Sequence, residues 1–163
     1  EREPVVAAAR PVLESEAESL GETFFLVSLR AQEIVILDKV EGTGFLRAAP
    51  RIGSSVPVHA TAVGKLYLAF APGLLSFPGG TLEAFTARTA IDAGALRAAV
   101  AETKLRRWAS NRDEWIPGLS VLAVVPARGG SKGIPGNKKQ LGRLFACEGV
   151  HDRSKKYICF PGD

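Results

Sequence analysis

The sequence contains no methionine, and it has only two cysteines and two histidines among its 163 residues. The spacing of Cys147 and Cys159 fits no metal site, and His59 and His151 do not form a pair, so we expect no bound metal. Two unpaired thiols are typical of a reducing compartment, here the cytoplasm. No apolar run approaches the roughly 20 residues that a membrane span requires, and no signal pattern opens the chain. Since no methionine is present to start the chain, we expect a piece of a longer protein or a sequence whose N-terminal part has been left out.

Most of the chain also lacks a net positive charge, although the net charge of the whole sequence is +4. Residues 128–163 carry eight basic and three acidic residues, whereas residues 1–127 carry 13 basic and 14 acidic residues. The basic character therefore belongs to the tail. The main part of the chain gives no electrostatic indication of nucleic-acid binding.

Helical and strand-like patterns alternate along the first 125 residues. Apolar spacing predicts helices at 11–20, 62–70 and 93–107. Pro11 should end or kink any helix before the first of these, and Gly21 should end the helix at 11–20. Thr61 and Asp92 are the expected N-caps of the second and third helices. Leu82–Phe85 reads as a helical turn. β-branched and aromatic runs predict strands at 23–30, 33–41, 45–48, 108–111 and 119–125, with a loop at 53–55. Short strand connections favour antiparallel pairing. We therefore predict an α+β fold with a mainly antiparallel sheet flanked by helices.

Small residues dominate the first turn of the predicted helix at 62–70. Exposed backbone N–H groups there would present partial positive charge to a small anion such as a carboxylate. Gly64 would allow a ligand to approach closely. The alternative is that these small residues only let the helix pack tightly on a sheet.

The segment around this helix resembles the signature of the effector-binding domain of IclR-type (isocitrate lyase regulator) transcription factors. It reads Val56-Pro57-Val58-His59-Ala60-Thr61-Ala62-Val63-Gly64-Lys65. Further stretches fit the same family in the same order, at 11–23, 35–47, 53–57, 85–92 and 112–121. The resemblance covers about three quarters of the chain.

The resemblance implies a GAF/profilin-like fold and a pocket for a small organic acid or aromatic effector. It implies a homodimer or homotetramer, no cofactor and no catalytic residues. A winged helix-turn-helix is expected N-terminal to this domain, so operator DNA would be bound only through a part that this chain lacks. Carried over by position, the effector would contact the backbone amides of Ala62 and Val63, together with Asn111 and Val121. Family members with small hydrophilic ligands have an acid and a cysteine at the last two positions, so Asn111 and Val121 suggest a less polar or differently shaped effector. The alternatives are that Asn111 bonds its own turn and that Val121 is plain strand core.

A glycine-rich loop with two cations follows the apolar strand at 119–125. Such a loop can surround a phosphate with backbone amides. Residues 122–141 resemble the opening motif of sugar-acid cytidylyltransferases, which implies a nucleotide-phosphate loop at Arg128, Gly129, Gly130, Ser131 and Lys132. The alternative reading is a solvated basic turn. Only about 30 residues follow, too few to complete a nucleotide-binding domain, so a fragment of, or fusion to, such an enzyme is the second hypothesis for function.

The composition changes near residue 125, which divides the chain into an effector-binding domain at 1–125 and a tail at 126–163. The tail is either a diverged closing hairpin of the same domain or foreign sequence, whether by chimera or by design. The effector-domain family expects a closing strand, but only the short apolar piece at 157–160 offers one. A third hypothesis is an oligomerisation domain whose pocket is vestigial.

Overall fold

The computed structural model describes residues 4–43, 50–71, 73–124 and the backbone of 155–159. Within these ranges the chain forms one sheet in the order β3-β2-β1-β6-β5-β4. The strands are β1 (Phe24–Arg30), β2 (Glu33–Val40), β3 (Ser55–Val56), β4 (Trp108–Arg112), β5 (Ser120–Val124) and β6 (Lys155–Cys159). The helices are α1 (Pro4–Leu20), α2 (Ala62–Phe70) and α3 (Ala93–Arg106).

The sheet is mainly antiparallel, as predicted. β1 pairs antiparallel with β2, β2 with β3, and β4 with β5. β6 lies between β1 and β5 and runs parallel to both, so its backbone joins the two halves of the sheet. This position accords with the alternative in which part of the tail belongs to the same domain, while the boundary at residue 125 stays a prediction.

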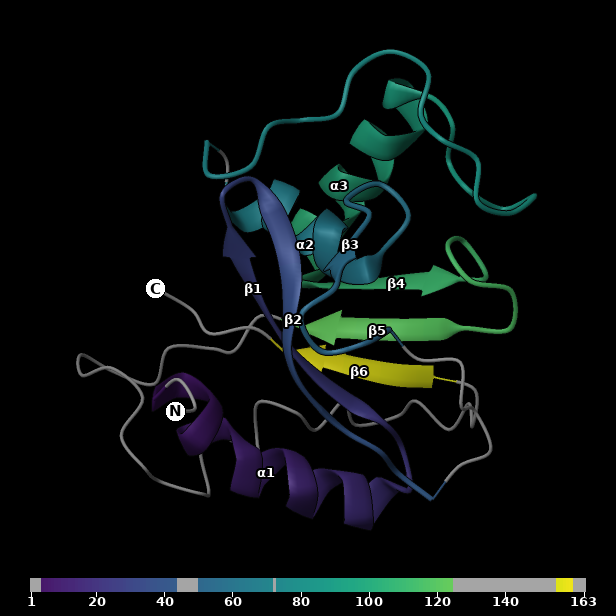
Figure 1. The fold of residues 1–163 in the computed structure, drawn as a ribbon. Helices are drawn as coiled ribbons and strands as arrows, with labels where there is room; N and C mark the ends of the chain where they lie inside the picture. The colour runs from purple at the N-terminus through teal and green to yellow at the C-terminus, as the bar shows by residue number, and fades with distance from the viewer. Residues whose placement is uncertain (1–3, 44–49, 72, 125–154, 160–163) are drawn as a thin grey trace.

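Helices cover both faces of the sheet (Figure 1). Alternation along β1 separates two apolar clusters, because successive strand side chains point to opposite faces. Phe24 and Leu26 pack with α1, whereas Phe25 and Val27 pack with α2. α3 contacts α2 and β4 and so lies outside the second layer. The predicted α+β fold with a sheet flanked by helices is confirmed.

A bulge in the β1–β2 ladder redirects one acidic side chain. The register shifts between Leu26 and Val27, which pair with Asp38 and Ile36. The extra residue turns Asp38 to the α1 face, away from the face of Ile36. There Asp38 Oδ1 accepts a hydrogen bond from the Arg10 guanidinium at 2.8 Å. The bulge therefore ties α1 to the sheet.

The first helix is longer than the sequence indicated. α1 runs without interruption through Pro11, so the prediction that the regular helix begins only at Pro11 is wrong, whereas a kink at Pro11 stays a prediction. Pro11 and Ala7 are both exposed, so the carbonyl that loses its N–H partner faces water, which can satisfy it. Gly21 ends the helix as predicted: its φ is +69° and its N–H donates to Ala17 O at 2.9 Å.

The remaining elements match the sequence pattern with two differences, and one predicted strand is untested. The 23–41 hairpin, α2, α3, β4 and β5 are confirmed within a few residues. The prediction of a helical turn at 82–85 is wrong. Leu82 N–H donates to Ile91 O and Thr81 forms a β-bridge with Asp92, and these contacts hold the segment extended. β3 forms where only a loop was expected, since Ser55 and Val56 pair with Val35 and Ile34. The predicted strand at 45–48 lies outside the described residues.

Candidate functional site

Thr61 fixes the start of α2. Its backbone is extended (φ −124°, ψ 149°), and its Oγ1 accepts a hydrogen bond from Gly64 N–H at 3.2 Å. The same hydroxyl donates to Pro57 O at 2.7 Å. The N-cap predicted from the capping preference of threonine is confirmed, and the same hydroxyl also fastens the loop that precedes the helix.

Gly64 is needed for a contact within the chain. A Cβ placed on it would lie 1.8 Å from Val58 O, so only glycine lets the loop at 57–60 cross the helix start. The expectation that Gly64 makes room for a ligand is therefore wrong. The alternative of tight packing describes this residue better, although the partner is the preceding loop and not the sheet.

The first two amides of α2 have no acceptor among the described residues. Ala62 and Val63 have fully buried side chains, yet no described oxygen accepts a hydrogen bond from either N–H. The first N–H groups of a helix have no intrahelical partner, and together with the helix dipole they attract an anion. The two predicted donors are thus present at the helix start.

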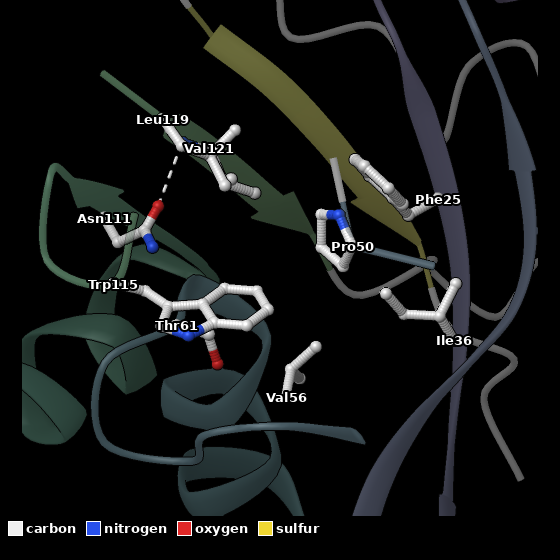
Figure 2. A pocket seen from close by; sticks show the side chains of 9 residues that line it. All are labelled: Phe25, Ile36, Pro50, Val56, Thr61, Asn111, Trp115, Leu119 and Val121. Carbon is white, nitrogen blue, oxygen red and sulfur yellow. Dashed lines mark hydrogen bonds between the residues drawn. The ribbon is translucent and has the colours of Figure 1, made fainter. Parts of the chain in front are cut away.

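A small apolar pocket lies on the α2 face of the sheet, with Thr61, the residue just before these amides, in its wall (Figure 2). Strands β1, β2, β3, β4 and β5 each contribute a side chain, and the cap residue of α2, the β4–β5 turn and Pro50 between β2 and β3 complete the wall. The pocket is a nearly closed cavity of about 10 Å³. Its walls are formed by Phe25, Ile36, Pro50, Val56, Thr61, Asn111, Trp115, Leu119 and Val121.

Asn111 is fully buried, and both ends of its amide are used by the protein. Nδ2 donates to Ala60 O and Oδ1 accepts from Val121 N–H, each at 3.0 Å (Figure 2). Asn111 therefore connects β4 with β5 and with the residue just before the α2 cap, and it does not bond its own turn. This side chain positions the helix start.

Val121 belongs both to the strand core and to the pocket wall, being 4% exposed. The structure therefore brings Asn111, Val121 and Thr61 to one pocket. Ala62 and Val63 follow Thr61 directly but do not themselves line the pocket. The four predicted site residues are neighbours in space, and their contact with an effector stays a prediction.

Lys65 and Glu114 form a nearly buried ion pair that sequence reasoning did not assign. Lys65 Nζ lies 2.7 Å from Glu114 Oε2, and the two side chains are 8% and 17% exposed. Lys65 also donates to Ser110 O at 3.1 Å. Both residues lie in stretches that fit the IclR-type pattern, but no local signal pairs residues 49 positions apart. The ion pair fastens α2 to the β4–β5 turn and neutralises a cation close to the pocket.

Trp115 is the second residue that sequence reasoning missed. It lies on the turn after Glu114, is half-buried, and points across the pocket (Figure 2). An aromatic residue in a connection between two strands is the signal that was available. Among the described residues, no group of three His, Cys, Asp or Glu side chains could hold a metal ion.

The family model for the C-terminal part of the bacterial transcriptional regulator IclR matches residues 1–131. The chain belongs to this family. The chain is 39% identical over 132 residues to SauR of Cupriavidus necator, a probable transcriptional regulator, with 77% of this chain and 51% of SauR covered. It is 34% identical to the HTH-type transcriptional regulator TtgV of Pseudomonas putida over 74% of this chain and 47% of TtgV.

Solved structures show the same fold. The Thermotoga maritima IclR superimposes with a TM-score of 0.66 at 28% identity, covering 73% of this chain and 49% of that chain. An IclR homologue from Microbacterium hydrocarbonoxydans, complexed with 4-hydroxybenzoate, gives 0.66 at 24% identity, covering 77% and 52%. The predicted GAF-like architecture is confirmed by these IclR neighbours.

These comparisons identify the chain as an effector-binding domain of an IclR-type regulator, and the chain spans about half the length of the curated relatives it matches. The predicted phosphate loop, from Arg128 to Lys132, lies outside the described residues. In the part of the chain that the structure describes, no helix is long and apolar enough to cross a membrane.

Proposed function

We propose that this domain senses a small carboxylate, which binds with its charged end at the backbone amides of Ala62 and Val63. The body of the effector would enter the adjacent pocket, with Asn111 and Val121 in its wall. Such a domain reports the presence of an effector and does no chemistry on it, in line with relatives that are transcriptional regulators.

The observation that carries the proposal is that two amides without a described acceptor directly follow Thr61, which lies in the wall of an apolar pocket. The positive end of the α2 dipole favours an anion there. Lys65 cannot attract that anion strongly, because Glu114 neutralises it at 2.7 Å. The carboxylate would therefore depend on backbone N–H groups. The 4-hydroxybenzoate in the Microbacterium homologue supports a ligand of this chemical class.

A sensor domain must transmit the binding of its effector to the rest of the protein. We infer that the whole protein binds operator DNA through a separate DNA-binding part and assembles as a dimer or tetramer through domains of this kind. Effector binding would then shift the relative population of subunit arrangements and so change operator affinity.

The test removes one amide while keeping the backbone. Proline fits the first position of a helix, and Thr61 already has the extended conformation that a following proline requires. Ala62→Pro deletes the Ala62 N–H and should weaken benzoate binding at least about tenfold, because a hydrogen bond to a charged group contributes about 1.5–3 kcal/mol. Isothermal titration calorimetry measures this change.

The matched control is Ala93→Pro. Ala93 occupies the first position of α3, where Asp92 has the same φ and ψ as Thr61, but it does not line the pocket. This variant should bind benzoate as the unmodified chain does. Circular dichroism confirms that both variants fold. Equal affinity for Ala62→Pro and Ala93→Pro, or no saturable binding of any carboxylate to the unmodified chain, contradicts the proposal.

A further inference from the structure

The turn between β4 and β5 is fixed along its backbone on both sides of Trp115. Glu114 O accepts a hydrogen bond from Thr89 Oγ1 at 2.6 Å, and the Glu114 carboxylate binds Lys65. Asp113 Oδ1 accepts from Gly118 N–H at 2.7 Å, and Asp113 N–H donates to Leu119 O at 3.1 Å. The first two contacts come from the 85–89 segment and from α2, and the last two lie within the turn itself. The turn therefore cannot move as a unit without breaking several hydrogen bonds and a nearly buried ion pair.

The polar groups of the pocket are already used inside the protein. The Thr61 hydroxyl bonds Pro57 and Gly64, and the Asn111 amide bonds Ala60 and Val121. No charged side chain is part of the described lining. A ligand rich in hydroxyl or carbonyl groups would lose hydrogen bonds to water without replacement, which costs free energy. The pocket therefore favours a ligand with one carboxylate and an apolar body.

The pocket must open before it can hold such a body. The present space of about 10 Å³ is about enough for one water molecule. The other apolar side chains of the lining, apart from Pro50, are 1–6% exposed and belong to the sheet core. Pro50 has a closed ring and cannot swing away. Trp115 is half-buried and is attached to a fixed turn, so rotation of its side chain is the movement that opens the pocket at least cost.

We propose that Trp115 closes the empty pocket and determines its specificity, selecting flat aromatic monocarboxylates over short hydrophilic oxo acids. The inference rests on the proposed function, which supplies the site for the carboxylate. On binding, the indole would rotate from the space that the ring needs and stack against that ring, a contact that favours flat aromatic ligands. The size of residue 115 would then set the largest ring that fits.

The experiment follows the tryptophan itself. The chain has two tryptophans, and Trp108 lies near Arg106, outside the pocket lining. In Trp108→Phe, the remaining fluorescence reports Trp115 alone. We expect benzoate to change this emission along a saturable curve, with an affinity at least about tenfold higher than that of pyruvate.

Substitution of Trp115 tests specificity. Trp115→Ala should bind 2-naphthoate about tenfold more tightly and benzoate about tenfold more weakly than the unmodified chain, and Trp115→Phe should restore the preference for benzoate. Trp108→Ala should leave both affinities unchanged. The measurements are calorimetric titrations of the full chain, with folding checked by circular dichroism.

Three results overturn the inference, and they differ in what they say of the proposed function. If benzoate binds in a manner that depends on Ala62 while Trp115→Ala leaves all affinities unchanged, the sensing function stands and the role of Trp115 is wrong. If no carboxylate binds to the unmodified chain or to Trp115→Ala, both are wrong. Tighter binding of pyruvate than of benzoate also overturns the role of Trp115.

Discussion

Gly64→Ala adds a single methyl group where the loop before α2 crosses the helix. The new Cβ would lie 1.8 Å from Val58 O and 2.5 Å from Val58 C. Real Cβ atoms essentially never approach another heavy atom closer than 3.0 Å. The obstacle is backbone, which cannot rotate away as a flexible side chain could. Either the loop at 57–60 or the first turn of α2 must shift, and the Thr61 cap would be strained with it.

The cost can be estimated from overpacked protein cores. Extra methyl groups in well-packed sites cost about 1–3 kcal/mol, and a backbone obstacle puts Gly64→Ala near the upper end, at about 3 kcal/mol. That is a large part of the total stability of about 5–15 kcal/mol that is typical of a folded domain. For a chain of this size the melting temperature should fall by about 6–12 °C.

Urea unfolding followed by far-ultraviolet circular dichroism measures the change, with a thermal melt as a second reading. Gly79→Ala is the matched control, because a Cβ there has no heavy atom within 4 Å and its φ is not in the left-handed region. The control should stay within about 0.5 kcal/mol of the unmodified chain. A loss below about 1 kcal/mol for Gly64→Ala, or one equal to that of the control, refutes the reasoning.

Three further predictions concern charged groups and are measured by urea unfolding. Lys65→Met should cost about 3 kcal/mol, because it leaves Glu114 nearly buried and unpaired, and adding Glu114→Gln should recover part of the loss; no recovery contradicts the ion-pair account. Arg10→Ala should cost about 2 kcal/mol, since Asp38 is 5% exposed and keeps only a backbone N–H among its described partners; an unchanged midpoint contradicts it. Burial raises the pKa of Glu16, so its stabilising contribution is complete below its ordinary pKa of 4.5 and is lost as pH rises through the folded-state value. Glu16→Gln should therefore be more stable than the unmodified chain at pH 7 and no more stable below pH 4.5; a gain at low pH alone contradicts the burial argument.

The sequence predicted those helices whose ends are set by neighbouring residues. α2 and α3 begin after Thr61 and Asp92, whose side chains accept from the third helical amide as cap residues do. Two features depended on contacts between distant segments. β3 is only two residues long and exists because β2 offers a partner, and the bulge that turns Asp38 to α1 is set by pairing with β1. The short apolar piece at 157–160 allowed a closing strand, but nothing in it indicated that β6 would pair with both β1 and β5.

The candidate site was predictable in its positions and less so in its roles. The resemblance to the IclR-type family placed Ala62, Val63, Asn111 and Val121 at one site, and the structure brings them close. It could not show that Gly64 faces Val58, because chain crossings depend on the path of the loop. The closing position proposed for Trp115 also depends on tertiary contacts, because Lys65 of α2 and Thr89 of the 85–89 segment hold the turn.

The most direct test of the account is nuclear magnetic resonance of the unmodified chain labelled with nitrogen-15. Titration with benzoate should move the amide protons of Ala62 and Val63 downfield along one saturable curve, because they gain a charged acceptor. The amide resonances of the first turn of α3, which begins at Ala93, should not shift. Saturable binding that leaves the Ala62 and Val63 resonances in place would contradict the central claim, that the start of α2 holds the carboxylate of the effector.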